Sequence, residues 1–212
     1  MQHKYLASGL IVAAAFAAGI LFSITRQGEV PSVDIPGFLW PNPRLIAPFK
    51  LHASDGTNFT EANFTNRWTL IFFGFTNCPD ICPSTMTTLK QLVEQWGPDM
   101  DVEHDLQIVF VSVDPERDDD ATLMNYVSYF HPSFVGVTGN EDDLNGFAGQ
   151  FGALFMKVNS AGIPGYAMDH SASIILVAPS SHFVGVFSPP HEVADIKGRL
   201  IRMIEFLMEG TS

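Results

Sequence analysis

The two cysteines of the chain stand four positions apart in the segment GFTNCPDICP, residues 74–83. Thiolates bind soft metal ions and exchange with disulfides. Two cysteines this close in a loop can also reach the Cα separation of about 4.4–6.8 Å that a disulfide requires. A bridge that closes so short a loop would restrict little chain entropy, which disfavours a purely structural disulfide. The spacing therefore predicts that Cys78 and Cys82 carry out redox chemistry or bind a metal ion.

The segments on either side of the cysteines predict a strand followed by a helix. Residues 68–73 form a short apolar run rich in β-branched and aromatic side chains, which is typical of a buried strand. After the cysteines, apolar residues recur at helical spacing as far as Trp96. Pro83 suits the first position of a helix, so we expect the helix to begin there with Cys82 at its cap. A thiol beside a helix N-terminus has a lowered pKa, which would populate the reactive thiolate.

One of the seven histidines has distinctive surroundings. His170 lies in the segment YAMDHSAS, residues 166–173, directly before an apolar run that predicts a strand. We expect it on the loop that precedes this strand. Two thiolates and one imidazole would suit a soft or borderline metal ion. Spacing alone leaves His170 one candidate among seven, because a histidine is more often structural than a ligand.

Strands and helices alternate along the rest of the chain, which predicts an α/β fold with a parallel-rich sheet. A small hairpin is expected at residues 47–51 and 58–59, around the Asp55-Gly56 turn. Further strands are expected at residues 106–113, 134–137, 153–158, 172–177 and 182–187, and further helices at 119–130, 141–151 and 193–207. A dithiol between the first crossover strand and its helix is the thioredoxin-like arrangement, although the usual motif there is Cys-x-x-Cys and this chain has one more residue between the cysteines.

The N-terminal segment predicts a membrane anchor. Residues 5–24 contain no charged side chain, and about 20 apolar residues are enough to cross a bilayer. We therefore expect a transmembrane helix within residues 1–26, a proline-rich spacer at 27–43 and the folded domain at 44–212; a removed signal peptide is the alternative. The chain has 23 acidic against 11 basic residues and a net charge of −12, which argues against nucleic acid as a partner.

Three segments of the chain resemble the signature blocks of the Sco/SenC family. They are FFGFTNCPDICP at residues 72–83, VSVDPERD at 111–118 and YAMDHS at 166–171. The family comprises membrane-anchored, thioredoxin-like copper proteins that assist assembly of the binuclear copper centre of cytochrome c oxidase. The resemblance implies that Cys78, Cys82 and His170 bind copper. The N-terminus lacks the long presequence of a mitochondrial member, so the resemblance implies a single-pass protein of a bacterial inner membrane with its domain in the periplasm.

The donor set is consistent with copper in both oxidation states. Thiolates favour Cu(I), and imidazole suits Cu(I) and Cu(II). Cu(II) would want a fourth ligand, for which Asp80, Asp114, Asp169 or water are candidates. A closed zinc site is disfavoured because it needs four protein ligands.

Two kinds of function follow from these residues. In the first, the protein delivers copper, and its partners are the copper-bearing subunit of cytochrome c oxidase, a copper donor protein and a thiol reductant. In the second, it is a thiol-disulfide reductase in which Cys78 and Cys82 are catalytic and keep the copper-ligand cysteines of the oxidase reduced. A copper or redox sensor would use the same site, and the sequence does not separate it from the other two.

Overall fold

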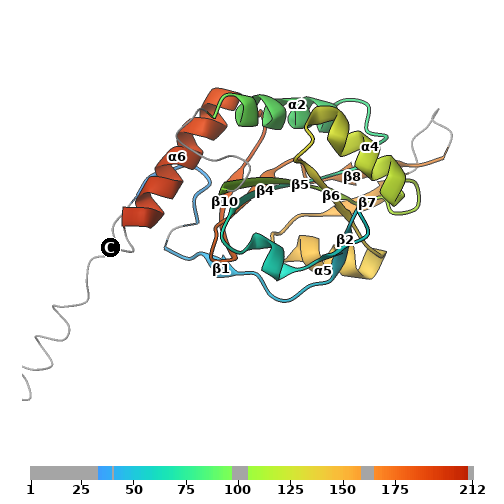
Figure 1. Cartoon of the computed structure of the whole chain (residues 1–212), viewed down its shortest axis with the longest axis horizontal. Coiled ribbons are helices and arrows are strands. Elements are labelled where there is room, and N and C mark those ends of the chain that lie inside the picture. The colour runs from blue at the N-terminus through green and yellow to red at the C-terminus, as the bar shows by residue number, and fades with distance from the viewer. Residues whose placement is uncertain (1–32, 40, 97–104, 159–164, 210–212) are drawn as a thin grey trace, which may run out of the picture. The chain divides into compact units, whose positions relative to one another are not determined.

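A mixed eight-stranded sheet forms the centre of the computed structural model, with strand order β1-β10-β9-β4-β5-β6-β2-β3 (Figure 1). The structure describes residues 33–39, 41–96, 105–158 and 165–209. The strands are β1 (Arg44–Leu45), β2 (Leu51–Ala53), β3 (Asn58–Phe59), β4 (Trp68–Gly74), β5 (Leu106–Ser112), β6 (Val135–Thr138), β7 (Phe155–Val158), β8 (Ala167–His170), β9 (Ile174–Val177) and β10 (His182–Phe187). The helices are η1 (Glu61–Phe64), α2 (Ile81–Glu94), α4 (Asp120–Phe130), α5 (Glu141–Gly149) and α6 (Val193–Glu209).

The centre of the sheet is built from β4, β5 and β6, which are parallel to one another. Every residue of β4 and of β5 is buried, which explains why both strands are continuous apolar runs rather than alternating ones. The remaining strands are antiparallel to their neighbours: β9 pairs with β4, β10 with β9, and β2 with β6. The predicted α/β class and thioredoxin-like fold are confirmed, but the sheet is mixed rather than mainly parallel.

Helices cover both faces of the sheet. Figure 1 shows α2 and α4 on one face and α5 on the opposite face. Each predicted helix has a counterpart within a few residues, with one correction at the cysteines. The helix begins at Ile81 with Asp80 at the N-cap, so Cys82 lies inside its first turn and Pro83 is its third residue. Proline is tolerated there because the first four N–H groups of a helix have no partner within the helix.

A second, two-stranded sheet carries the histidine. β7 and β8 pair antiparallel, with Phe155 opposite His170. The sequence predicts β7 but places His170 on a loop, which is wrong: His170 is the last residue of β8. The segment AMDH is too short and too mixed in polarity to stand out as a strand in the sequence.

The predicted membrane anchor, residues 1–26, lies outside the described residues, as does the first part of the predicted spacer. Within the described ranges, no helix combines the length and hydropathy needed to span a bilayer. The compact unit that holds the sheet runs from Asp34 to Ser212. It includes residues from the predicted spacer, because Ile35 is buried and Leu39 donates its N–H to the carbonyl of Val184 at 2.8 Å.

Candidate metal centre

The end of β4 brings the backbone close to a sulfur atom. Gly74 is the last residue of the strand, and a Cβ atom there would lie 2.9 Å from Cys82 Sγ and 2.7 Å from the Phe110 ring. Real Cβ atoms do not approach other atoms this closely, so either contact would force a displacement. Glycine at this position therefore allows Cys82 to lie against the end of the strand.

Cys78 caps the helix that carries Cys82. Its Sγ accepts a hydrogen bond from the backbone N–H of Cys82 at 3.4 Å, while the side chain of the N-cap residue Asp80 makes no capping bond. The sulfur thus satisfies one of the unpaired N–H groups of the first turn, a role usually filled by a side-chain oxygen. Both cysteines are free thiols; Cys78 is half-buried and Cys82 is fully buried.

His170 faces the cysteines with one specific ring nitrogen. Its Nε2 lies 3.4 Å from Cys82 Sγ, and its Nδ1 lies 3.1 Å from the carbonyl oxygen of Ser171. A carbonyl oxygen can only accept, so Nδ1 carries the proton and Nε2 presents its lone pair to the sulfur. The rings of Phe72 and Phe75 pack edge-on against the imidazole, with ring centroids 6.0 and 5.8 Å from its centroid, and hold its orientation.

The three side chains converge on a common point. The donor atoms of Cys78, Cys82 and His170 all lie within 4.8 Å of one another, and they form the single such group of histidine, cysteine or carboxylate ligands among the described residues. Two sulfurs and a lone-pair nitrogen in this arrangement suit a soft metal ion such as Cu(I). The structure therefore brings together the three residues that the sequence singled out.

Comparison with known proteins assigns the chain to a family. A family model described as SCO1/SenC matches residues 40–205. The chain belongs to the SCO1/SenC family. It is 30% identical over 207 residues to a SCO2-like protein of Rickettsia felis, a match that covers 93% of this chain and 98% of that protein. It is 34% identical over 157 residues to the mitochondrial SCO1 homolog 1 of Arabidopsis thaliana, which covers 74% of this chain but 46% of that protein, so the chain spans about half the length of this relative.

Solved structures of SCO1/SenC proteins have the same fold. A crystal structure of Arabidopsis thaliana ScoI with copper bound is 33% identical, with a TM-score of 0.69 over 76% of this chain and 98% of that one. Yeast Sco1 with copper bound is 31% identical, with a TM-score of 0.67 over 77% of this chain and 90% of that one. Copper is thus bound by two proteins that are similar to this chain in both sequence and fold.

The thiols of this SCO1/SenC chain share one proton. A hydrogen bond from the Cys82 side chain is the main cause that lowers the pKa of Cys78 to about 4, with smaller contributions from the backbone of Asp80 and Cys82. The same hydrogen bond and burial raise the pKa of Cys82 above its usual range. The two shifts have one origin, because the S–H of Cys82 donates to the Cys78 thiolate. The metal-free pair therefore carries one negative charge near neutral pH.

The site opens to the surface on one side. A cavity of about 530 Å³ is lined by Cys78 and His170 together with Phe75, Arg117 and Tyr166 among others, whereas Cys82 is not part of its wall. Cys78 and His170 thus face the opening, and Cys82 lies behind them. A partner that exchanges ligands or disulfides with the site would meet Cys78 and His170 first.

The candidate fourth ligands do not join the group. Asp80 and Asp169 are exposed and lie outside the convergent set. Asp114 is fully buried, but its carboxylate accepts hydrogen bonds from Arg117 and, at 2.6 Å, from the Tyr166 hydroxyl.

Four other histidines lie within the described residues, and each has a hydrogen-bond partner of its own. The pairs are His52 with Asp120, His131 with Ser133, His182 with Ser180, and His191 with the carbonyl of Ala172. His3 and His104 lie outside the described residues. The site residues that sequence reasoning did not identify are Gly74, Phe72, Phe75 and the carbonyl of Ser171. All four fall within or beside the cysteine and histidine blocks, but only the fold shows that they touch the ligands.

Proposed function

We propose that this chain binds one copper ion through Cys78, Cys82 and His170 and delivers it to the binuclear copper centre of cytochrome c oxidase during assembly. The observation that carries the proposal is the convergence of the three donor atoms within 4.8 Å, with the lone pair of His170 Nε2 directed at the sulfur pair. The copper-bound structures of Arabidopsis ScoI and yeast Sco1 support it. Delivery to the oxidase rests on membership of the SCO1/SenC family.

The site is suited to carrying copper as cargo. Both sulfurs are free, and one thiolate already exists before the metal arrives, so binding must displace only the proton on Cys82. The exposure of Cys78 and His170 at the cavity allows a partner to offer its own ligands to the ion. A buried four-ligand site would hold the ion permanently, whereas three protein ligands beside an opening allow handover.

Copper titration of the reduced full chain tests the proposal. Cu(I) and Cu(II) should each bind at one tight site, and Cys78→Ser and Cys82→Ser should abolish tight binding of both ions. His52→Ala is the matched control, because His52 is half-exposed and pairs with Asp120 away from the cysteines. Failure of the parent protein to bind copper, or several weak sites of equal affinity, would contradict the proposal. In cells that lack the protein, the oxidase should be short of copper, and added copper should partly restore its content.

A thiol-disulfide reductase is the second candidate, and one observation favours it. Cys78 is accessible and has a lowered pKa, while Cys82 is buried next to it, which is how an attacking thiol and a resolving thiol are arranged. In this function, the Cys78 thiolate would attack a disulfide of the partner, form a mixed disulfide with one of its sulfurs and release the other as a thiolate. Cys82, after losing its proton, would then attack Cys78 Sγ, which releases the partner dithiol and leaves a Cys78–Cys82 disulfide. Such a protein needs no histidine, so the contribution of His170 distinguishes the two functions.

The membrane location is also part of the proposal. Residues 1–26 would anchor the protein to a bacterial inner membrane, with the copper site in the periplasm. There the site would meet the copper-bearing oxidase subunit and a copper donor protein. The support is the uncharged apolar segment at residues 5–24. Fractionation of cells should find the protein in the inner membrane, and protease added to spheroplasts should digest the domain.

A further inference from the structure

Two buried carboxylates lie one turn apart in the segment 114–118, next to the metal centre but outside it. Asp114 is 0% exposed and Asp118 is 1% exposed. The backbone N–H groups of Arg117 and Asp118 both donate to the carbonyl of Asp114, which makes this segment a tight turn after β5. Burying a carboxylate is costly unless it is fully hydrogen-bonded. The partners of these two side chains therefore indicate what the segment does.

Asp118 holds the segment that carries the cysteines. Its Oδ2 accepts from the backbone N–H of Thr76 at 2.8 Å, and its Oδ1 accepts from the Thr76 hydroxyl at 2.6 Å. The Ser112 hydroxyl, at the end of β5, donates to the same carboxylate at 2.5 Å. Thr76 stands two residues before Cys78. Asp118 thus fixes the start of the cysteine loop to the neighbouring strand.

Asp114 holds the strand that carries the histidine. Its carboxylate accepts from the Tyr166 hydroxyl at 2.6 Å and from Arg117 Nε, and Arg117 Nη1 donates to the carbonyl of Tyr166 at 3.0 Å. The Arg117 guanidinium also lies over the Tyr166 ring, 4.0 Å from its centroid. Tyr166 immediately precedes β8, whose last residue is His170. Asp114 and Arg117 thus fix the start of β8.

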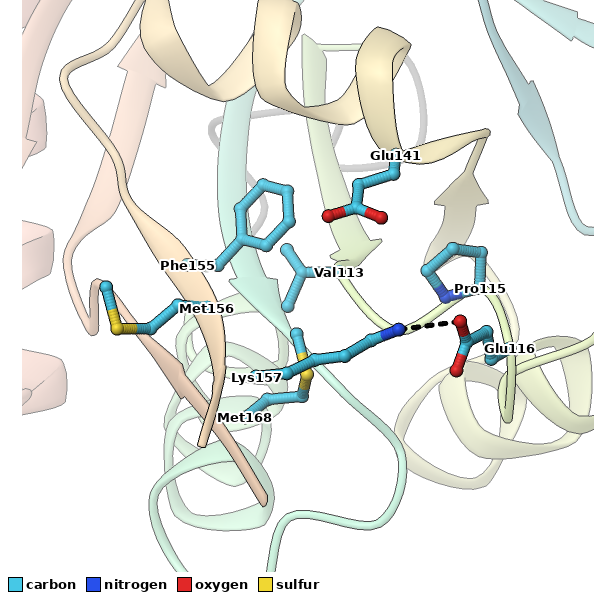
Figure 2. Close-up of a pocket in the computed structure, with 8 residues that line it drawn as sticks. All are labelled: Val113, Pro115, Glu116, Glu141, Phe155, Met156, Lys157 and Met168. Carbon is cyan, nitrogen blue, oxygen red and sulfur yellow. Dashed lines mark hydrogen bonds and ion pairs between the residues drawn. The ribbon is translucent and has the colours of Figure 1, made fainter. Parts of the chain in front are cut away.

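An exposed ion pair joins the segment 114–118 to β7, the partner strand of β8. Figure 2 shows Lys157 extending from β7 towards Glu116, beside a cavity of about 230 Å³, and the two charges are 2.6 Å apart. Glu116 also lies within 3.2 Å of the Tyr166 hydroxyl. An exposed ion pair of this kind contributes little stability. The positioning of β8 therefore depends mainly on the buried contacts of Asp114.

From these contacts we infer that the segment 114–118 positions the two halves of the copper site separately: Asp118, through Thr76, positions the thiols, and Asp114 with Arg117, through Tyr166, positions the imidazole. No residue of this segment belongs to the ligand group. These are positioning residues that act through the backbone of the two ligand-bearing segments. The inference rests on the proposed copper site, and it assigns a role to a segment that bears no ligand.

The two halves should give different metal phenotypes. Thiolates provide most of the affinity for Cu(I), whereas Cu(II) depends on the nitrogen donor as well. Partners that orient metal ligands typically change metal affinity by about 10- to 100-fold when they are lost. Loosening the imidazole should therefore weaken Cu(II) selectively, and loosening the cysteine loop should weaken both ions.

Two conservative variants test the inference. Tyr166→Phe keeps the ring over Arg117 but removes the hydroxyl, and we expect Cu(II) affinity to fall about tenfold with a changed electron paramagnetic resonance spectrum, while Cu(I) affinity stays within about twofold of the parent. Thr76→Val removes the hydroxyl bond to Asp118, and we expect the affinities for both ions to fall about tenfold. Tyr129→Phe is the control, because Tyr129 is 81% exposed on α4 and should match the parent.

Asp114→Asn serves as a second variant of the imidazole half. It keeps the size of the side chain and removes the charge that Arg117 faces, and it should reproduce the selective loss of Cu(II). Thermal unfolding is measured alongside for every variant. A lower melting temperature without any change in copper affinity or spectrum would overturn the inference. It would also be overturned if Tyr166→Phe and Thr76→Val lost Cu(I) and Cu(II) affinity in the same proportion.

A metal-free measurement separates this inference from the proposed function. In the apo protein, the imidazole NMR resonances of His170 should shift in Tyr166→Phe and remain in place in Thr76→Val and Tyr129→Phe. If both the parent and Tyr129→Phe fail to bind copper, the proposed function is wrong, while the resonances still report whether Tyr166 positions His170. If the resonances are unchanged in Tyr166→Phe, the positioning role is wrong whether or not copper binds.

Discussion

The sulfur of Cys78 accepts the backbone N–H of Cys82 at 3.4 Å and so replaces the side-chain oxygen that normally caps a helix. One atom therefore has two roles: it stabilises the first turn of α2 and it is a candidate metal ligand. This places the thiolate at the positive end of the helix, where negative charge is favoured.

The first prediction follows from the charge on Cys78. Because the pKa of Cys78 is lowered to about 4, its thiolate should react with iodoacetamide even at about pH 6, where an ordinary thiol, with a pKa near 9.0, is almost unreactive. Cys82 should react far more slowly, since it is fully buried and its pKa is raised. Mass spectrometry of the metal-free protein after brief alkylation would check the order. Equal labelling of both cysteines would contradict the assigned charge state.

Stability should depend on pH in a direction that this pKa sets. The folded-state pKa of Cys78 lies below its unfolded value, so its stabilising contribution is complete above about pH 9 and is lost as the pH falls through about 4. Cys78→Ser should therefore lower the free energy of unfolding by about 1–2 kcal/mol at neutral pH and by much less at about pH 4. Denaturant titrations of the metal-free parent and variant at several pH values give this difference. A difference that does not change with pH would contradict the prediction.

Gly74 should tolerate no side chain. Gly74→Ala would place a Cβ atom 2.7 Å from the Phe110 ring and 2.9 Å from Cys82 Sγ, and neither neighbour can move freely in the core. We expect a loss of about 1–3 kcal/mol in unfolding free energy together with weaker copper binding. The control is Gly146→Ala in α5, where a Cβ atom meets nothing within 4 Å and stability should be unchanged or slightly increased. Wild-type copper affinity in Gly74→Ala would contradict the close approach of Cys82.

His170→Ala should separate the two candidate functions. A reductase should keep most of its activity, since thiolate attack depends on Cys78 and Cys82. A copper carrier should lose most of its Cu(II) affinity and less of its Cu(I) affinity, because the soft thiolates remain. The variant should still fold, although it leaves a gap between Phe72 and Phe75. Copper titrations and oxidase assembly in copper-poor medium provide the readout, and full assembly in this variant would favour the reductase.

Removal of residues 1–26 should leave a soluble, folded and copper-competent domain. The compact unit runs from Asp34 to Ser212, so the deletion removes none of its residues. Circular dichroism and a copper titration of the truncated protein would show native secondary structure and one site. A truncated protein that does not fold would mean that the N-terminal segment belongs to the core.

The sequence predicts the part of the site that depends on local patterns. The apolar run of β4, the two cysteines and the amphipathic α2 are adjacent in the chain, so their arrangement follows from strand and helix periodicity. His170 is 88 positions from Cys82, and spacing alone did not select it. The family resemblance selected it, because contacts between distant segments leave no periodic signal.

Asp114 shows where sequence reasoning leaves alternatives open. Asp114 is one of several candidate fourth ligands in the sequence, and the fold directs its carboxylate to Arg117 and Tyr166. The strand β8 was also not predicted, since four residues of mixed polarity satisfy no clear pattern. The contact between Asp114 and Tyr166 joins residues 52 positions apart, and such a partner becomes visible only when the chain is folded.

In the proposed delivery, the unequal burial of the two sulfurs would set the order in which the ligands leave the copper ion. Cys82 Sγ lies against the end of β4 and is fully buried, whereas Cys78 and His170 face the opening. An incoming ligand would first replace the exposed donors, while Cys82 still held the ion. Cys82 would therefore be the last ligand to leave the ion, and the geometry around this one sulfur would limit the rate of copper release.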